Sequence, residues 1–137
     1  MKLQIAKNLL EFVEAVSVRL KLKMVFSVCN QYGNMVAVHA MDDAYLVSFD
    51  ISMKKAYTAA ALRLPTIELT KLAAPGQPLF GVDRLDEGRI IIIGGGVPLY
   101  HNGVLVGGLG ASGGSGEEDH AVAACGAAAL SRIIKKA

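Results

Sequence analysis

A glycine-rich stretch between an apolar run and an alanine-rich run constrains this chain more than any other feature. Residues 104–130 read VLVGGLGASGGSGEEDHAVAACGAAAL, and Gly108, Gly110 and Gly113 have the spacing G-x-G-x-x-G of dinucleotide-binding folds. Such a site needs a second strand with an acidic ribose ligand after the helix, and no strand pattern follows here. The acids at 117–119 also occupy the place of a pyrophosphate. We therefore predict that the glycines admit a close backbone neighbour: a helix, another subunit or a flat ligand.

The first half of the chain combines helical periodicity with a predicted β-hairpin. Apolar residues at helical spacing predict a long helix over 3–20, and two β-rich runs at 24–30 and 34–41 flank a turn. A second helix is expected over about 48–62. It should end before Pro65, because proline disfavours helix in the residue before it.

The second half contains a short helix, three predicted strands and a final helix. Thr66 is expected to be the N-cap of the short helix. Apolar runs at 90–93, at 97–101 and from 104 onward predict the strands, the last two joined by an Asn-Gly turn at 102–103. Ser115 and Glu118 form a capping box at the start of the final helix.

The order of these elements predicts an α+β fold. The early hairpin and the three later strands make a five-stranded antiparallel sheet, with N-terminal, central and C-terminal helices packed on it. A chain of 137 residues can bury a core without disulfide bonds, so residues 1–137 are expected to form a single domain.

The composition indicates a cytoplasmic protein with a buried subunit interface. Hydrophobic residues make up 53% and charged residues 19%. The net charge is only +2 and no basic stripe is visible, so nucleic-acid binding is not expected. Apolar runs such as Ile90–Ile93 are too short to span a membrane, and Glu11 and Glu14 interrupt any secretory segment. Cys29 and Cys125 are expected to be reduced core residues.

Three long segments resemble the GlcG/HbpS family, in particular the C-terminal domain of PduO-type proteins and their stand-alone relatives encoded near diol and glycerol dehydratases. The segments read GNMVAVHAMDDAY, DISMKKAYTAAALRLPTIELTKLAAPGQPLFGV and RIIIIGGGVPLYHNGVLVGGLGASGGSGEEDHAVAACGAAAL. The motifs that carry the resemblance as a set are Asp-Ile-Ser with Lys-Ala-Tyr-Thr-Ala, Gly-Gly-Gly-Val-Pro, and Gly-x-Ser-Gly-Gly-x-x-Glu-x-Asp. Nearly the whole chain after Met24 is covered.

The resemblance implies a profilin-like or PAS-like fold with a five-stranded antiparallel sheet. It also implies homo-oligomers: dimers, tetramers or octamers. Several members of the family bind haem, and one branch is described as haem-degrading or redox-sensing. The implied partners are a corrinoid adenosyltransferase or the dehydratase machinery. The implied location is the cytoplasm, with a bacterial microcompartment as the narrower alternative.

Seven residues are candidates for contacting a flat ligand such as haem. His39 is the candidate axial ligand of the iron, because haem iron needs a donor such as histidine. The cofactor-binding candidates are His39, Lys55, Thr58, Gly95, Gly96, Gly110 and Gly113. For three of them there is a simpler interpretation: His39 as a surface residue on its strand, Lys55 as a solvated lysine, and Thr58 as a capping or core residue. No catalytic residue is predicted.

Two hypotheses from different functional classes follow. The first is a small oligomeric binding protein, not an enzyme, whose subunit clefts hold a haem-like or corrinoid-like tetrapyrrole. The second is a ligand-free assembly module, whose last helix would pack closely through Ala121, Ala124, Cys125 and Ala128. A haem-degrading or small-acid enzyme is a third, less favoured hypothesis.

Overall fold

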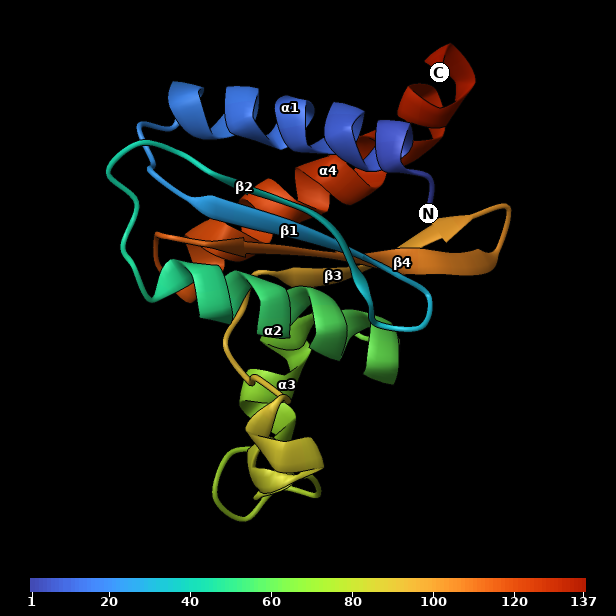
Figure 1. Cartoon of the computed structure of the whole chain (residues 1–137). Helices are drawn as coiled ribbons and strands as arrows, with labels where there is room; N and C mark the ends of the chain where they lie inside the picture. The colour runs from blue at the N-terminus through green and yellow to red at the C-terminus, as the bar shows by residue number, and fades with distance from the viewer.

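Two β-hairpins build the sheet of this protein, and helices cover both of its faces (Figure 1). The structure is a computed structural model that describes all residues, 1–137. Its helices are α1 (Leu3–Arg19), α2 (Ser48–Leu62), α3 (Thr66–Leu72) and α4 (Gly116–Lys136), with two single-turn 3-10 helices, η1 (Val82–Arg84) and η2 (Asp86–Gly88). Its strands are β1 (Val25–Asn30), β2 (Met35–Ala40), β3 (Gly96–His101) and β4 (Val104–Ser112). None of the helices has both the length and the apolar character that crossing a bilayer requires.

The sheet joins the two hairpins through their inner strands. The strand order is β2-β1-β4-β3, and every pair is antiparallel. Between β3 and β4, Asn102 and Gly103 both have positive φ, at 51° and 76°, as a type I′ turn requires. The predicted Asn-Gly hairpin is therefore confirmed, as are the antiparallel character of the sheet and the α+β class.

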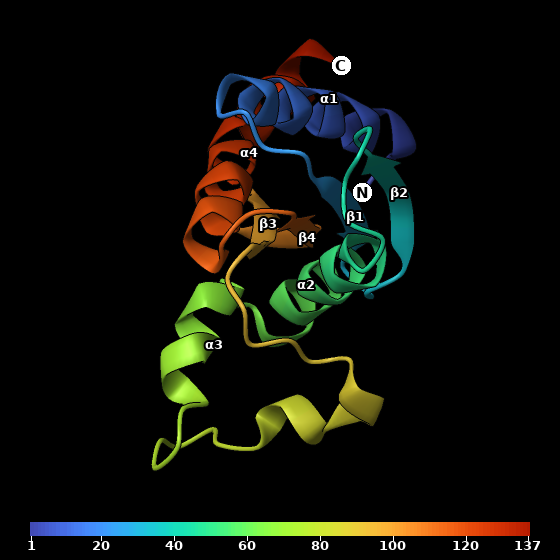
Figure 2. The ribbon, with the colours of Figure 1, turned by 90° about the vertical axis from the view of Figure 1, so that its left-hand side faces the viewer.

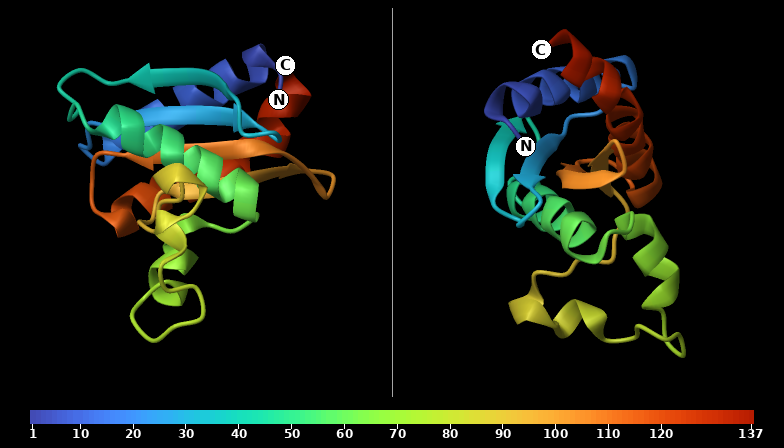
Figure 3. Two further views of the ribbon diagram at one scale, coloured as in Figure 1. Left: turned by 60° about the horizontal axis from the view of Figure 1, so that its bottom comes forward. Right: turned by 90° about the vertical axis from the view of Figure 1, so that its right-hand side faces the viewer.

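The two faces of the sheet carry different layers. Helices α1 and α4 lie on one face, while α2 lies across the strands on the other (Figure 3). Phe26 and Val28 of β1 belong to the main core with α1 and α4. The alternate residues face α2: Ser27 Oγ lies 2.7 Å from Ser52 Oγ, and the Cys29 thiol donates to the Ala56 carbonyl at 3.3 Å.

Glycines allow α2 to lie directly on the strands. A Cβ atom on Gly96, Gly108 or Gly110 would lie between 2.0 and 2.3 Å from a backbone carbonyl oxygen of α2. Atoms cannot approach this closely, so each position requires the absence of a side chain. The close neighbour that the sequence predicted for Gly108 and Gly110 is therefore a helix of the same chain.

The prediction of a fifth strand at 90–93 is wrong. The sheet has four strands, and residues 89–96 instead form an extended segment, here called the threonine strap, that runs past α2 and α3. Three threonine hydroxyls replace the ladder of a neighbouring strand: Thr58 bonds Arg89 O and Ile91 N–H, Thr70 bonds Ile92 O, and Thr66 bonds Ile93 O and Gly96 N–H. An apolar run can thus be extended and well bonded without joining a sheet.

The same bonds correct the prediction for Thr66. Pro65 is the N-cap of α3 and Thr66 is the first helical residue. Its hydroxyl donates to the Ile93 carbonyl at 2.7 Å and accepts the Gly96 N–H at 2.9 Å. Because the hydroxyl is used on the strap, it does not cap the helix. Beyond α3, the chain forms a lobe with η1 and η2 that extends away from the sheet (Figure 2).

The two cysteines differ in environment. Cys29 is fully buried between β1 and α2, as predicted, whereas Cys125 is exposed on α4. The prediction of a core position for Cys125 is wrong, because the inward face of α4 is formed by Val122, Ala123 and Gly126.

We expect Ellman's reagent at about pH 8 to titrate only the Cys125 thiol of the folded chain, and the Cys29 thiol only after denaturation. Burial raises the pKa of the Cys29 thiol to about 11, so almost no thiolate forms, and the reagent has no access to it. The variant Cys125→Ser is the control and should show no reactive thiol while folded. Reaction of both thiols in the folded wild type would contradict this arrangement.

Candidate functional site

The three motifs that carried the family resemblance meet in space around a buried ion pair. Lys55 of α2 and Asp119 of α4 lie 2.8 Å apart, and their side chains are only 1% and 2% exposed. Lys55 Nζ also donates to the Ala111 carbonyl at 2.9 Å, and the other oxygen of Asp119 accepts the Gly114 N–H at 2.7 Å. The pair thereby connects α2, β4 and the first turn of α4.

The stability of the fold depends on this pair because both charges are buried. Burial lowers the pKa of Lys55 below its ordinary value, although the hydrogen bond and the charge of Asp119 act in the opposite direction. A buried ammonium group is tolerated only when it is paired and hydrogen-bonded. Asp119 supplies that partner, while Ser115 and Glu118 complete the predicted capping box beside it.

Most of the predicted cofactor-binding residues have partners within the chain. A Cβ on Gly95 would lie 2.7 Å from Lys55 Nζ, and one on Gly113 would lie 2.3 Å from the Lys23 carbonyl oxygen. Thr58 is bonded to the threonine strap, as described above. Lys55, Gly95, Gly96 and Gly110 are thus brought together at the contact between α2 and the sheet, where they hold the fold.

His39 lies on the opposite face of the sheet from Lys55. It is on β2, an outer strand, and pairs across the ladder with Phe26, which faces α1. Its Nδ1 lies 2.6 Å from Glu14 Oε1 of α1, and the two side chains are 35% and 34% exposed. The sheet therefore lies between His39 and the predicted residues that pack at α2, namely Lys55, Gly96 and Gly110.

The surroundings of His39 fit those of a metal-ligating histidine. Such histidines commonly donate one ring N–H to a carboxylate, which fixes the tautomer and leaves the other nitrogen for the metal. Glu14 is placed to accept from Nδ1, so Nε2 is the nitrogen left for a ligand. His101 and His120 differ, because the Nδ1 atom of each is buried without a partner.

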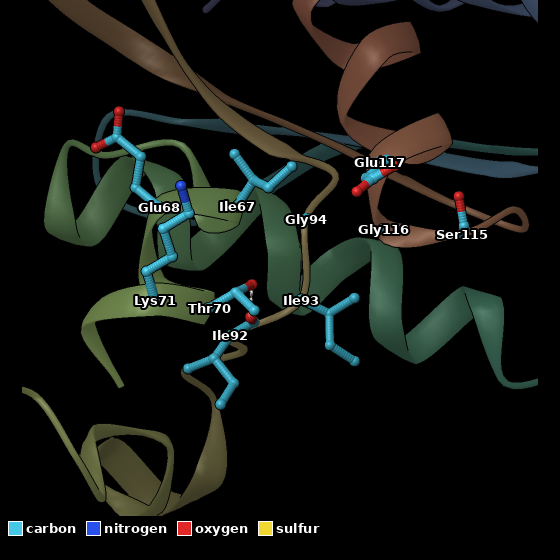
Figure 4. A pocket seen from close by; sticks show the side chains of 10 residues that line it. All are labelled: Ile67, Glu68, Thr70, Lys71, Ile92, Ile93, Gly94, Ser115, Gly116 and Glu117. Carbon is cyan, nitrogen blue, oxygen red and sulfur yellow. Dashed lines mark hydrogen bonds between the residues drawn. The ribbon is translucent and has the colours of Figure 1, made fainter. Parts of the chain in front are cut away.

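A groove of about 660 Å³ opens next to the ion pair. Figure 4 shows its parts: α3 on one side, strap residues 92–94 in the middle, and the first turn of α4 on the other side. The lining residues are Ile67, Glu68, Thr70, Lys71, Ile92, Ile93, Gly94, Ser115, Gly116 and Glu117. None of them is a histidine, cysteine, methionine or tyrosine, so the groove offers no side chain suited to an axial haem ligand.

Comparison with known proteins identifies the family. The sequence model described as "Haem degrading protein HbpS-like" matches residues 1–128. The chain belongs to the HbpS-like family. The resemblance predicted from the three motifs is thereby confirmed.

Relatives of this HbpS-like chain include stand-alone and multidomain proteins. A 15.0 kDa protein of the dhaT-dhaS intergenic region of Citrobacter freundii is 42% identical over 118 residues, which cover 86% of this chain and 83% of that protein. The corrinoid adenosyltransferase PduO of Salmonella typhimurium is 38% identical over 112 residues, 82% of this chain. The match spans only 33% of PduO, so the chain resembles one part of that enzyme.

Among solved structures, the PduOC:Heme complex is similar throughout. It has a TM-score of 0.89 and 34% sequence identity, and the match covers 94% of each chain. The architecture described above is therefore one that a haem-binding protein also adopts.

Two partners in the site were not assigned from the sequence. From the sequence, Asp119 is one of the acids at 117–119 that oppose a pyrophosphate, and Glu14 only an acid that interrupts a secretory segment. The Gly-x-Ser-Gly-Gly-x-x-Glu-x-Asp motif did contain Asp119, so its presence in the set was a usable signal. Nothing local linked Glu14 to His39, because the two are 25 positions apart.

Proposed function

We propose that this protein binds haem through His39, as a binding protein and not as an enzyme. The observation that carries the proposal is the similarity of the whole chain to PduOC, whose solved structure is a haem complex. Within this chain, His39 with its Glu14 partner is the histidine whose environment suits an iron ligand.

In this mechanism the residues of the chain have separate tasks. His39 Nε2 would hold the iron, while Glu14 would accept the Nδ1 hydrogen and hold the ring in place. When bound, haem supplies a redox-active iron and a strong visible absorption band. Lys55 and Thr58 hold the fold on the other side of the sheet and would not touch a haem at His39.

The proposed assembly is a homo-oligomer, either a dimer or a larger form built from dimers. Because β2 is an outer strand, no further strand of the chain lies beside His39, and a second subunit could supply the other wall of a haem cleft there. Large apolar side chains are also exposed just before and at the start of α2, namely Tyr45, Leu46, Val47 and Phe49. Exposed apolar groups of this size are typical of surfaces that contact another protein. A second copy would cover them.

The proposed setting is the corrinoid-dependent metabolism suggested by the relatives. The name of one relative, corrinoid adenosyltransferase PduO, supports a partnership with an adenosyltransferase, and the family resemblance implies the dehydratase machinery as a further partner. This setting would place the protein in the cytoplasm or within a bacterial microcompartment. A corrinoid-like tetrapyrrole is the alternative ligand in that setting.

A ligand-free assembly module is the second candidate function. The outer face of α4 is built of small exposed residues, Ala121, Cys125 and Ala128, and such a face permits close helix packing. Under this hypothesis the protein would form oligomers but give no saturable haem spectrum.

A haemin titration followed by visible absorbance tests the proposal. We expect wild type to give a saturable, shifted Soret band that His39→Ala loses. Glu14→Gln should keep the band but weaken haemin binding about 10-fold to 100-fold, because the ring loses its orienting carboxylate.

The variant His101→Ala is the matched control and should bind haemin like wild type. A band of equal affinity in His39→Ala would move the iron ligand to another residue. The lack of any saturable band in wild type would favour the assembly module.

A further inference from the structure

We propose that the groove between α3 and the first turn of α4 is a binding site for a short peptide with free ends. The groove lies on elements that do not include His39, and its lining offers no axial donor for iron. This inference therefore stands independently of the proposed haem function. Its size, about 660 Å³, is within the range of pockets that hold small organic molecules.

The floor of the groove carries unused hydrogen-bond donors. The carbonyl groups of Ile92 and Ile93 accept from Thr70 and Thr66, but no group in the chain accepts the N–H of Ile92, Ile93 or Gly94. Gly94 is buried, and buried backbone N–H groups are nearly always paired. Successive N–H groups of an extended segment alternate in direction, so an extended peptide in the groove would accept from those that face it, as in strand-like recognition.

Apolar side chains form the next part of the site. Ile67 comes from α3, while Ile92 and Ile93 come from the strap (Figure 4). Ile93 is 48% exposed in the groove, so a ligand could cover its side chain. Covering these three side chains favours a ligand with apolar side chains of its own.

Charged side chains stand on both sides of the groove. Glu68 and Lys71 belong to α3 and Glu117 to α4, and none of the three is in an ion pair within the chain. A ligand with one carboxylate and one ammonium group can pair with Lys71 and with an acid. An anion alone fits poorly, because two acids line the groove and Ser115 already caps α4. A short apolar peptide with free ends satisfies the donors, the isoleucines and the charges together.

Titration with the dipeptide Leu-Leu, followed by amide nuclear magnetic resonance, tests the proposal. We expect saturable shifts confined to strap residues 92–94, to α3 and to the first turn of α4. Lys71→Gln and Glu117→Gln should each weaken the affinity about threefold to tenfold, since each removes one exposed ionic contact. Lys135→Gln, at the far end of α4, is the matched control and should bind like wild type.

Capping the peptide ends separates the charged contacts from simple apolar binding. N-acetyl-Leu-Leu-amide should bind wild type about tenfold or more weakly than Leu-Leu, since it can make neither ionic contact. Equal affinity for the two probes, or no saturable shift with Leu-Leu, would overturn the proposal. His39→Ala should bind Leu-Leu like wild type, so loss of haem binding and loss of peptide binding are distinguishable.

Discussion

Replacing Gly110 with valine is expected to destabilise the protein by more than about 3 kcal/mol, enough to unfold much of a marginally stable domain. A Cβ atom at this position would lie 2.0 Å from the Ser52 carbonyl oxygen and 2.7 Å from the Ala56 nitrogen. Both atoms are backbone of α2, so neither can rotate away. Relief requires the whole helix to move off the sheet, which also separates Ser27 from Ser52 and Cys29 from Ala56.

Urea unfolding followed by circular dichroism measures this effect. The control is Gly116→Ala, whose Cβ would meet its nearest atoms at an ordinary 3.4 Å and whose stability should stay within about 1 kcal/mol of wild type. A Gly110→Val variant with the wild-type midpoint would show that α2 does not need to lie this close to β4.

The second large effect concerns the buried ion pair. Asp119→Asn is expected to cost about 3–5 kcal/mol, because it leaves the Lys55 ammonium buried without a countercharge. Lys55 is 1% exposed, so water cannot replace the lost partner. Glu117→Gln, an exposed acid in the same helical turn, is the matched control and should change stability by less than about 0.5 kcal/mol.

The cost of Asp119→Asn should depend on pH. Burial already lowers the pKa of Lys55 in the folded state, and the loss of Asp119 removes the groups that raise it. At pH values between the lowered pKa of the folded variant and the ordinary pKa of lysine, Lys55 is protonated in the unfolded chain but neutral in the folded chain. Stability therefore increases with pH across this window.

Urea midpoints of the variant and wild type, compared between about pH 7 and about pH 9.5, measure this recovery. We expect the deficit of Asp119→Asn relative to wild type to shrink as pH rises. A deficit that stays constant or grows would mean that Lys55 is not the group that is left unpaired.

Local sequence patterns predicted an element correctly where a single local signal, such as a turn dipeptide or a capping box, sets its bounds. The helix over 48–62, the Asn-Gly turn and the capping box at Ser115 all have the expected bounds. The run at 90–93 failed because apolar periodicity reports burial and not the source of the hydrogen bonds. Hydroxyl groups on two helices supply those bonds here, and no local pattern indicates them.

The site was predictable only in part, because its partners come from distant segments. The need for a close neighbour at Gly110 followed from its missing side chain, but the identity of that neighbour depended on the path of α2. Lys55 was selected through the family motif, whereas its pairing with Asp119 depends on the packing of α2 against α4. His39 and Glu14 likewise meet only after β2 has paired with β1 below α1.

The strand order has a consequence for how much the lobe can vary in length. Each hairpin closes locally, but the β1–β4 ladder joins Val25 to Ser112 and encloses α2, α3 and the lobe in one long loop. The entropy of closing a loop grows only with the logarithm of its length, at about 0.6 kcal/mol per doubling. Adding a few residues between η1 and η2 lengthens this already long loop by a small fraction, so the entropic cost of closing it hardly changes. The lobe can therefore lengthen or shorten while the hairpins, the ion pair and the close contact of α2 stay as they are.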